Sequence, residues 1–128
     1  MRLLLDTCTF LWLITDDDSL SQQARDLFQM PQNEVFLSAV STWEITVKYQ
    51  LGKLPLPEHP RSYIPAQRRQ HHIETLSLGE DAIQHLANLP EIHRDPFDRM
   101  LICQAIQEGM VLLTPDPLIH QYPVKIVW

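Results

Sequence analysis

The densest group of chemically reactive side chains is the run from His93 to Arg99, which reads His-Arg-Asp-Pro-Phe-Asp-Arg. Asp95 followed by Pro96 predicts the start of a helix, with the aspartate as N-cap and the proline as first helical residue. Asp98 then falls in the first turn, where its carboxylate shares one side of the helix with that of Asp95. Two such acids either cap the helix and complement its dipole, or they hold a divalent cation through oxygen ligands.

Three further acids stand where a parallel sheet would bring them to the same place. Asp6 and Asp116 follow directly after apolar stretches, and Glu44 lies on the helix predicted after the second strand. Taken singly, Asp6 could be a turn or cap, Glu44 a capping-box partner of Ser41, and Asp116 a turn residue between two prolines. Taken together, all five carboxylates can converge at the carboxyl ends of the strands, where such sheets bind ligands. Carboxylates that close require a cation to stay ionised.

Oxygen ligands without a cysteine or histidine ligand pattern favour Mg²⁺ or Mn²⁺ over zinc. The six histidines show no metal-ligand spacing, and we expect His71 and His72 to form a polar surface. A hard cation on carboxylates typically acts on phosphates, by activating water and neutralising the leaving oxygen. With three glycines the chain has no glycine-rich phosphate loop, and no G-x-S-x-G motif or Cys/His nucleophile is present. Metal-dependent phosphodiester hydrolysis therefore remains, or phosphomonoester hydrolysis through an aspartate nucleophile.

The elements that must position these acids follow from the hydrophobic periodicity. Strands are predicted at 2–5, 35–37, 73–76, 110–113 and 124–127. Helices are predicted after Asp6, after Ser19 or Ser21, over 61–70 and after Asp95, with two more opening at the capping boxes Ser41-x-x-Glu44 and Ser77-x-x-Glu80. Strands that alternate with helices predict an α/β domain with a mainly parallel sheet.

The composition limits the class of protein. A chain of 128 residues that is 45% hydrophobic is expected to form one domain, residues 1–128, around a sizeable core. No apolar run approaches the length of a membrane span, and Cys8 and Cys103 are expected to be small buried residues rather than a disulfide framework. These features predict a cytoplasmic protein. The formal net charge of −6 argues against a default nucleic-acid binder, although a bound cation would offset part of it and basic residues cluster locally.

Four segments in order resemble the PIN-domain toxins of the VapC type. They are Leu4-Leu5-Asp6-Thr7, the stretch Ser38-Ala39-Val40-Ser41-Thr42-Trp43-Glu44-Ile45, the run from His93 to Arg99, and Thr114-x-Asp116. The resemblance covers essentially the whole chain. It implies a three-layer α/β/α sandwich with a central, mainly parallel sheet, and a Mg²⁺- or Mn²⁺-dependent endoribonuclease that is the toxin of a type II toxin–antitoxin pair. It also implies a homodimer inhibited by a cognate VapB-type antitoxin, with RNA as substrate and transfer RNA as one candidate.

Carried over by position, the resemblance implies specific roles. The catalytic acids are Asp6, Glu44, Asp95 and Asp98, and these hold the metal together with the more variable Asp116. Thr7 and Thr114 would be polar residues supporting those ligands. Candidate RNA contacts are Lys48, Arg68, Arg69, Arg94 and Arg99. Two positions depart from the family pattern: Cys8 stands where histidine is common, and Pro115 where arginine is common, which leaves the direction of Asp116 open.

Two alternatives remain at this point. One is a catalytically silent PIN-like domain that only binds a partner. The other is a phosphatase with Asp6 as covalent nucleophile, although its usual signature needs a second aspartate where this chain has Cys8.

Overall fold

A five-stranded parallel sheet forms the centre of the molecule in a computed structural model that describes residues 1–128. The strands are β1 (Arg2–Leu5), β2 (Glu34–Ser38), β3 (Glu74–Leu76), β4 (Val111–Leu113) and β5 (Ile126–Val127). Their spatial order is β3-β2-β1-β4-β5, and every neighbouring pair is parallel. The predicted strands and the parallel sheet are therefore confirmed. β1 is the central strand, with β2 and β3 on one side of it and β4 and β5 on the other.

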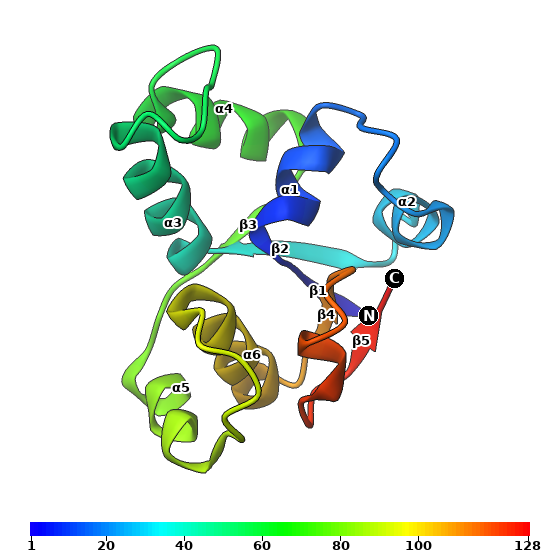
Figure 1. Ribbon diagram of the computed structural model, residues 1–128. Helices are drawn as coiled ribbons and strands as arrows, with labels where there is room; N and C mark the ends of the chain where they lie inside the picture. Colours follow the sequence, from blue (N-terminus) through cyan, green and yellow to red (C-terminus); the bar gives the residue numbers. More distant parts are fainter.

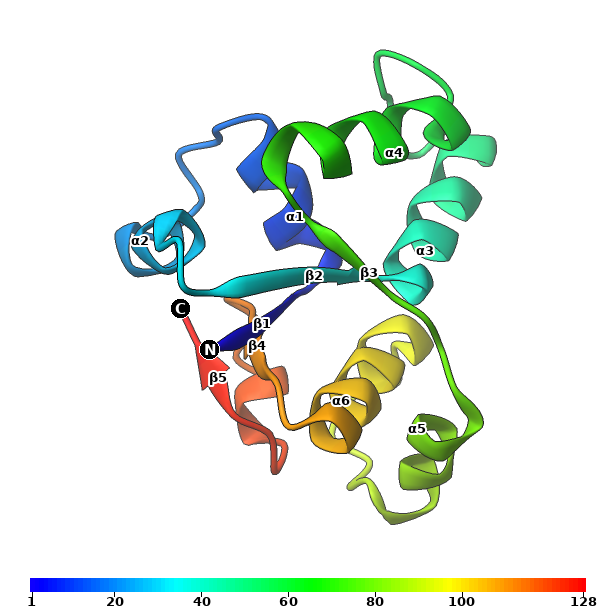
Figure 2. The same ribbon diagram turned by 180° about the vertical axis from the view of Figure 1, so that it is seen from behind.

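Helices cover both faces of the sheet (Figures 1 and 2). They are α1 (Thr7–Ile14), α2 (Gln22–Gln29), α3 (Ala39–Gln50), α4 (Pro60–His71), α5 (Glu80–Gln84) and α6 (Pro96–Glu108), with short 3₁₀ turns η1 (His85–Asn88) and η2 (Ile119–Gln121). In Figure 1, α1 to α4 lie on one side of the strands, and α5, α6 and η2 on the other. The predicted three-layer α/β/α sandwich is confirmed.

Alternation along β1 explains why there are two cores rather than one. Leu3 and Leu5 face one side and pack with Phe10 and Ile45, whereas Leu4 faces the other and packs with Ile102. All of these side chains are fully buried. Successive strand residues point to opposite faces, so a continuous leucine run is what a sheet covered on both sides needs.

The helix that carries Asp95 and Asp98 begins as predicted. One Asp95 carboxylate oxygen accepts the backbone N–H of Phe97 at 2.9 Å and that of Asp98 at 3.1 Å, and Pro96 is the first helical residue. Gly109 ends the helix with a φ of 64°, a left-handed conformation that glycine adopts without strain. The helix start is therefore determined by local chemistry.

Both predicted capping boxes are wrong. The N-cap of α3 is Ser38, whose hydroxyl accepts the N–H of Val40 at 2.9 Å, so Ser41 and Glu44 lie inside the helix and are buried. The N-cap of α5 is Gly79, two residues beyond the expected N-cap Ser77. In both cases the first residue of the helix depends on the path of the chain after the preceding strand. A four-residue sequence motif contains no information about that path.

Two smaller expectations also need correction. Cys103 is fully buried as predicted, but Cys8 is only partly buried, because it borders a cavity. The helix predicted after Ser77 is short and lies at the edge of its layer, so that Leu78 and Ile83 are 38% and 39% exposed rather than buried in the core. None of the helices has both the length and the apolar character needed to cross a membrane.

Candidate metal centre

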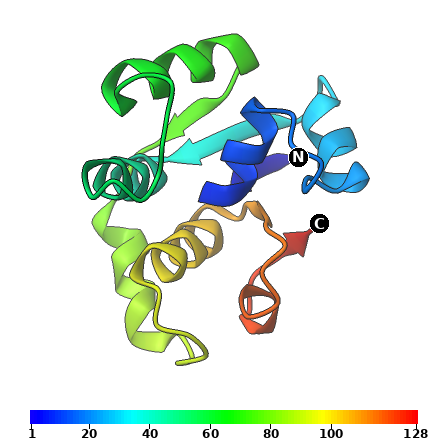
Figure 3. The ribbon, with the colours of Figure 1, turned by 45° about the horizontal axis from the view of Figure 1, so that its top comes forward.

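All five predicted carboxylates line one cavity of about 390 Å³. It is bordered by Asp6, Thr7, Cys8, Leu11, Glu44, Lys48, Lys53, Leu54, Asp95, Asp98 and Asp116. The acids come from the starts of α1 and α6, from the inside of α3 and from the loop after β4. Figure 3 shows α3 beside the sheet, and α3 packs against both α1 and α6. Parallel strands direct their carboxyl ends to one edge, and the site forms there.

Asp6 is the most deeply buried acid of the cavity. It follows β1 directly, caps α1 by accepting the N–H of Thr9 at 2.8 Å, and is 3% exposed. Burial raises the pKa of Asp6, and hydrogen bonds from Thr114, Thr9 and Cys8 only partly oppose that shift. The carboxylate is therefore held in place by the helix start while its negative charge remains poorly solvated.

Glu44 faces Asp6 from the middle of α3. The Thr7 hydroxyl donates to Oε1 of Glu44 at 2.6 Å and lies 3.0 Å from the Ser41 hydroxyl, while the Lys48 ammonium contacts Oε2 of Glu44. Glu44 is 4% exposed. Beside it, the exposed ring of Trp43 meets that of Phe97 edge-on, with 4.8 Å between the ring centres, which ties α3 to the start of α6.

Asp98 shows the electrostatic cost of the cluster. Burial, together with the neighbouring charges of Asp95, Asp6, Glu44 and Asp116, raises the pKa of Asp98 to about 7. A carboxyl group whose pKa is shifted in this way binds a proton in the absence of another cation. Asp98 is thus directed toward the other acids and not away from them.

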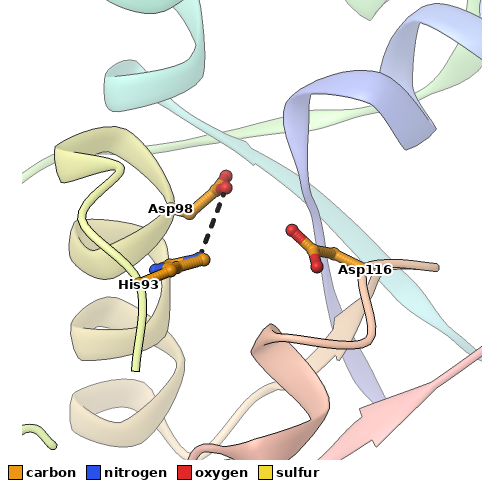
Figure 4. A group of neighbouring side chains, drawn as sticks. All are labelled: His93, Asp98 and Asp116. Atoms are coloured by element: carbon orange, nitrogen blue, oxygen red, sulfur yellow. Dashed lines mark ion pairs between the residues drawn. The ribbon is translucent and has the colours of Figure 1, made fainter. Parts of the chain in front are cut away.

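Asp116 reaches the cavity from the loop after β4. Its backbone N–H donates to the Thr114 hydroxyl at 3.2 Å, and its side chain accepts the N–H of Leu118 at 2.8 Å. Figure 4 shows Asp116 across from Asp98, with His93 beneath Asp98. One ligand atom from each of these three residues lies within 4.8 Å of the others.

His93 is a site residue that the sequence analysis missed. The absence of a repeated histidine spacing argued against histidine in the site, yet the loop before α6 places His93 Nε2 3.7 Å from Asp98 Oδ2. Its position two residues before Asp95 was the one available signal.

The predicted basic residues do not gather at one place. Lys48 lines the acidic cavity, whereas Arg94 and Arg99 border an adjoining cavity of about 560 Å³ together with His93. Arg68 and Arg69 lie on α4 and border a different depression near β3. Arg68 is half-buried and donates to the carbonyls of Leu37 and Glu74 and to the Thr42 hydroxyl. The fold brings together the acids, but only part of the basic set.

The donor atoms around the cavity fit a hard divalent cation. They are carboxylate oxygens, supported by the hydroxyls of Thr7 and Thr114, and Lys48 is the one cation paired with them. Oxygen donors of this kind suit Mg²⁺ and Mn²⁺, and the raised pKa of Asp98 reflects negative charge that a cation would offset. The Cys8 thiol faces Asp6, and both burial and the Asp6 charge raise its pKa, so it is a poor thiolate ligand here.

Fold and site together define an α/β/α domain with a carboxylate-lined cavity at the carboxyl ends of its parallel strands. The model of the PIN domain family matches residues 3–125, and the chain belongs to that family.

Three known proteins show the range of similarity. Ribonuclease VapC16 of Mycobacterium tuberculosis is 40% identical over 63 residues, which cover 49% of this chain and 45% of that protein. The structure of VapBC2 from Rickettsia felis bound to a promoter DNA fragment matches with a TM-score of 0.75 at 17% identity, covering 100% of this chain and 99% of the other. DNA-bound VapBC from Salmonella typhimurium matches with a TM-score of 0.71 at 19% identity, covering 99% and 97%. These two structures share the fold with this chain.

Proposed function

We propose that residues 1–128 act as a single PIN domain with Mg²⁺- or Mn²⁺-dependent endoribonuclease activity, as the toxin of a type II toxin–antitoxin pair. The observation that carries this proposal is the convergence of Asp6, Glu44, Asp95, Asp98 and Asp116 on one cavity. The 40% identity to a segment of a mycobacterial ribonuclease supports the choice of RNA as substrate. The alternative with Asp6 as covalent nucleophile is less favoured, because Asp6 is 3% exposed and already accepts several hydrogen bonds.

Each acid has a distinct part in holding the cation. Asp6 and Asp95 are fixed by the helix starts that they cap, and Asp98 presents a carboxylate from the first turn of α6. Glu44 is oriented by Thr7, and Asp116 completes the cluster from the loop after β4. Thr114 restrains both Asp6 and the backbone of Asp116. A bound cation would lower the pKa of water and neutralise charge on the leaving oxygen of an RNA phosphodiester.

The protein side chains also contribute outside the metal. Lys48 can hold a substrate phosphate at the edge of the cavity, because it lines that cavity and is 46% exposed. Arg94 borders the adjoining cavity and adds positive charge next to the acids. These cations reduce the repulsion between the RNA backbone and a domain of net charge −6.

The partners follow from the same proposal. A VapB-type antitoxin inhibits the domain, which forms a homodimer in the cytoplasm. Support for the antitoxin comes from the two VapBC complexes, whose toxin-like chain shares this fold over nearly its whole length. Co-expression with the product of a neighbouring small reading frame should relieve growth arrest, and lack of relief by any such product would contradict this part.

The activity is tested by Asp6→Asn on purified protein and total cellular RNA with Mg²⁺ or Mn²⁺. Loss of a charged metal ligand should remove several kcal/mol of transition-state stabilisation, which is on the order of a thousandfold in rate. Asp26→Asn on α2 is the matched control, because Asp26 is exposed and bonds only Gln22. Undiminished cleavage by Asp6→Asn would refute the proposed site. No cleavage by the wild type, combined with tight antitoxin binding, would favour the silent binding module.

A further inference from the structure

His93 is a buried side chain of the site to which the proposed function gives no part. It lies on the loop before α6, and its side chain is 10% exposed. Nε2 of the ring is buried without a hydrogen-bond partner, and it points toward Asp98 and Asp116 (Figure 4). A buried polar atom without a partner is costly and calls for an explanation in the chemistry of the site.

The other ring nitrogen, Nδ1, lies beside the hydroxyl of Tyr122. Three N–H groups are directed at that oxygen: the backbone of Ile92 at 3.3 Å, the backbone of His93 at 3.1 Å, and Nη1 of Arg99 at 3.0 Å. Tyr122 is 4% exposed, so water does not compete for it. A phenol oxygen has two lone pairs, and these donors already occupy them.

This arrangement determines where the imidazole proton resides. The Tyr122 hydroxyl lies 3.3 Å from Nδ1 of His93 and 3.4 Å from the backbone carbonyl oxygen of His93, so its own proton has two acceptors within reach. A proton on Nδ1 would be a fourth N–H directed at a saturated oxygen, whereas an unprotonated Nδ1 accepts from it. Nδ1 is therefore the ring nitrogen without hydrogen, and Nε2 carries it.

An Nε2 that carries hydrogen cannot ligate a metal ion, although its distances to Asp98 and Asp116 resemble those of a ligand group. It can instead donate to Asp98 Oδ2, which is 3.7 Å away and faces it (Figure 4). A shortening of this contact by about 0.5 Å would bring it into the range of a hydrogen bond.

We propose that His93 is a positioning residue, which donates Nε2–H to one oxygen of Asp98 and thereby holds the other oxygen toward the cation. Tyr122 and Arg99 act behind it by holding the ring in this tautomer. The inference rests on the metal-binding part of the proposed function and is independent of the RNA substrate.

Mn²⁺ binding without RNA provides the test. In electron spin echo measurements, wild-type protein loaded with Mn²⁺ should show no nitrogen coupling from a coordinated imidazole. His93→Leu should weaken Mn²⁺ affinity by about tenfold or more, which is the usual effect of losing a partner that orients a metal ligand. His93→Gln should retain most of the affinity, because its amide N–H can replace Nε2–H. His85→Gln is the control, because this partly exposed histidine lies outside the acidic cavity and bonds Gln107.

Each other outcome is decisive. An imidazole coupling that disappears in His93→Gln would make His93 a ligand and overturn the proposal. Equal Mn²⁺ affinity in His93→Leu and wild type, or no Mn²⁺ binding by folded wild type, would also overturn it. Circular dichroism establishes that the leucine variant is folded, and the glutamine variant carries the test if it is not. Failure of RNA cleavage with these binding results intact would refute the nuclease and leave the role of His93 standing.

Discussion

The acidic cavity and the environment of Arg68 on α4 show two opposite ways of treating buried charge. In the cavity, four acids raise the pKa of Asp98 beyond the effect of burial, and Lys48 is the one cation paired with the cluster. On α4, the guanidinium of Arg68 is half-buried but donates to two carbonyls and one hydroxyl of its own chain. Both regions contain buried charge, but the charge of Arg68 is satisfied by hydrogen bonds, whereas most of the charge in the acidic cavity has no partner of opposite sign.

The difference indicates that Arg68 has a structural role, whereas the acidic cavity is suited to binding a ligand. Arg68 connects α4 to β2, β3 and α3, so its bonds stabilise the edge of the sheet. The acids repel one another in the free protein, and the fold tolerates this because caps and hydroxyls fix Asp6, Asp95 and Glu44 individually. Charge that is positioned but not neutralised is typical of a site prepared for a ligand of opposite sign.

The largest expected effect comes from removing one uncompensated charge. Asp98→Asn should lower Mg²⁺-dependent RNA cleavage by at least a hundredfold, because a neutral amide is a weak ligand for a hard cation. The same substitution should raise the melting temperature of the metal-free protein at neutral pH, since it removes repulsion with Asp95, Asp6, Glu44 and Asp116. An RNA cleavage assay measures the first effect, and calorimetry of the metal-free protein measures the second. A metal-free Asp98→Asn variant that is less stable than wild type would contradict the conclusion that the acids of the cavity repel one another.

The second prediction concerns pH. The pKa of Asp98 is about 7 in the folded protein against 3.8 ordinarily, so the folded state retains a proton that the unfolded state releases. Stability of the metal-free protein should therefore fall as pH rises from about 4 to about 7 and then level off, and the raised pKa of Asp6 acts in the same direction. Denaturant unfolding at several pH values checks this. The slope should be smaller in Asp98→Asn, and an unchanged slope would assign the effect to other groups.

A third prediction addresses Arg68. Arg68→Met should lower the free energy of unfolding by about 2 kcal/mol, because the carbonyl of the buried Leu37 and that of Glu74 lose their donor. Mn²⁺ affinity should not change. Arg69→Met, on the exposed neighbour, is the control and should stay within about 0.5 kcal/mol of wild type. Loss of RNA binding by folded Arg68→Met, without loss of stability, would instead place Arg68 on an RNA surface.

The smallest effect is expected at Lys48. Its ammonium contacts Glu44 from a side chain that is 46% exposed, and such a pair contributes about 0.5 kcal/mol. Lys48→Met should therefore raise Mn²⁺ affinity by about twofold, because a competing cation is removed from Glu44. Isothermal titration provides the measurement. A marked decrease in affinity would show that Lys48 orients Glu44 rather than competing at it.

The sequence alone determined much of this protein. Short apolar runs predicted all five strands, the Asp95–Pro96 pair predicted the start of α6, and strand-end acids predicted the lining of the cavity. These features depend on neighbours within a few residues, or on the general rule that parallel strands end at one edge. The roles of those acids in binding a metal stay predictions.

Only the tertiary structure decided which side chains are satisfied. Glu44 fits a capping box in the local sequence, but α3 begins directly after β2 with Ser38 as its N-cap. Glu44 therefore lies inside the helix and lines the cavity. His93 enters the site because its loop packs on Tyr122, 29 residues away, and Arg68 is removed from the charged surface by carbonyls of β2 and β3. Hydrogen-bond partners far apart in the chain meet through packing, so local sequence patterns do not contain them.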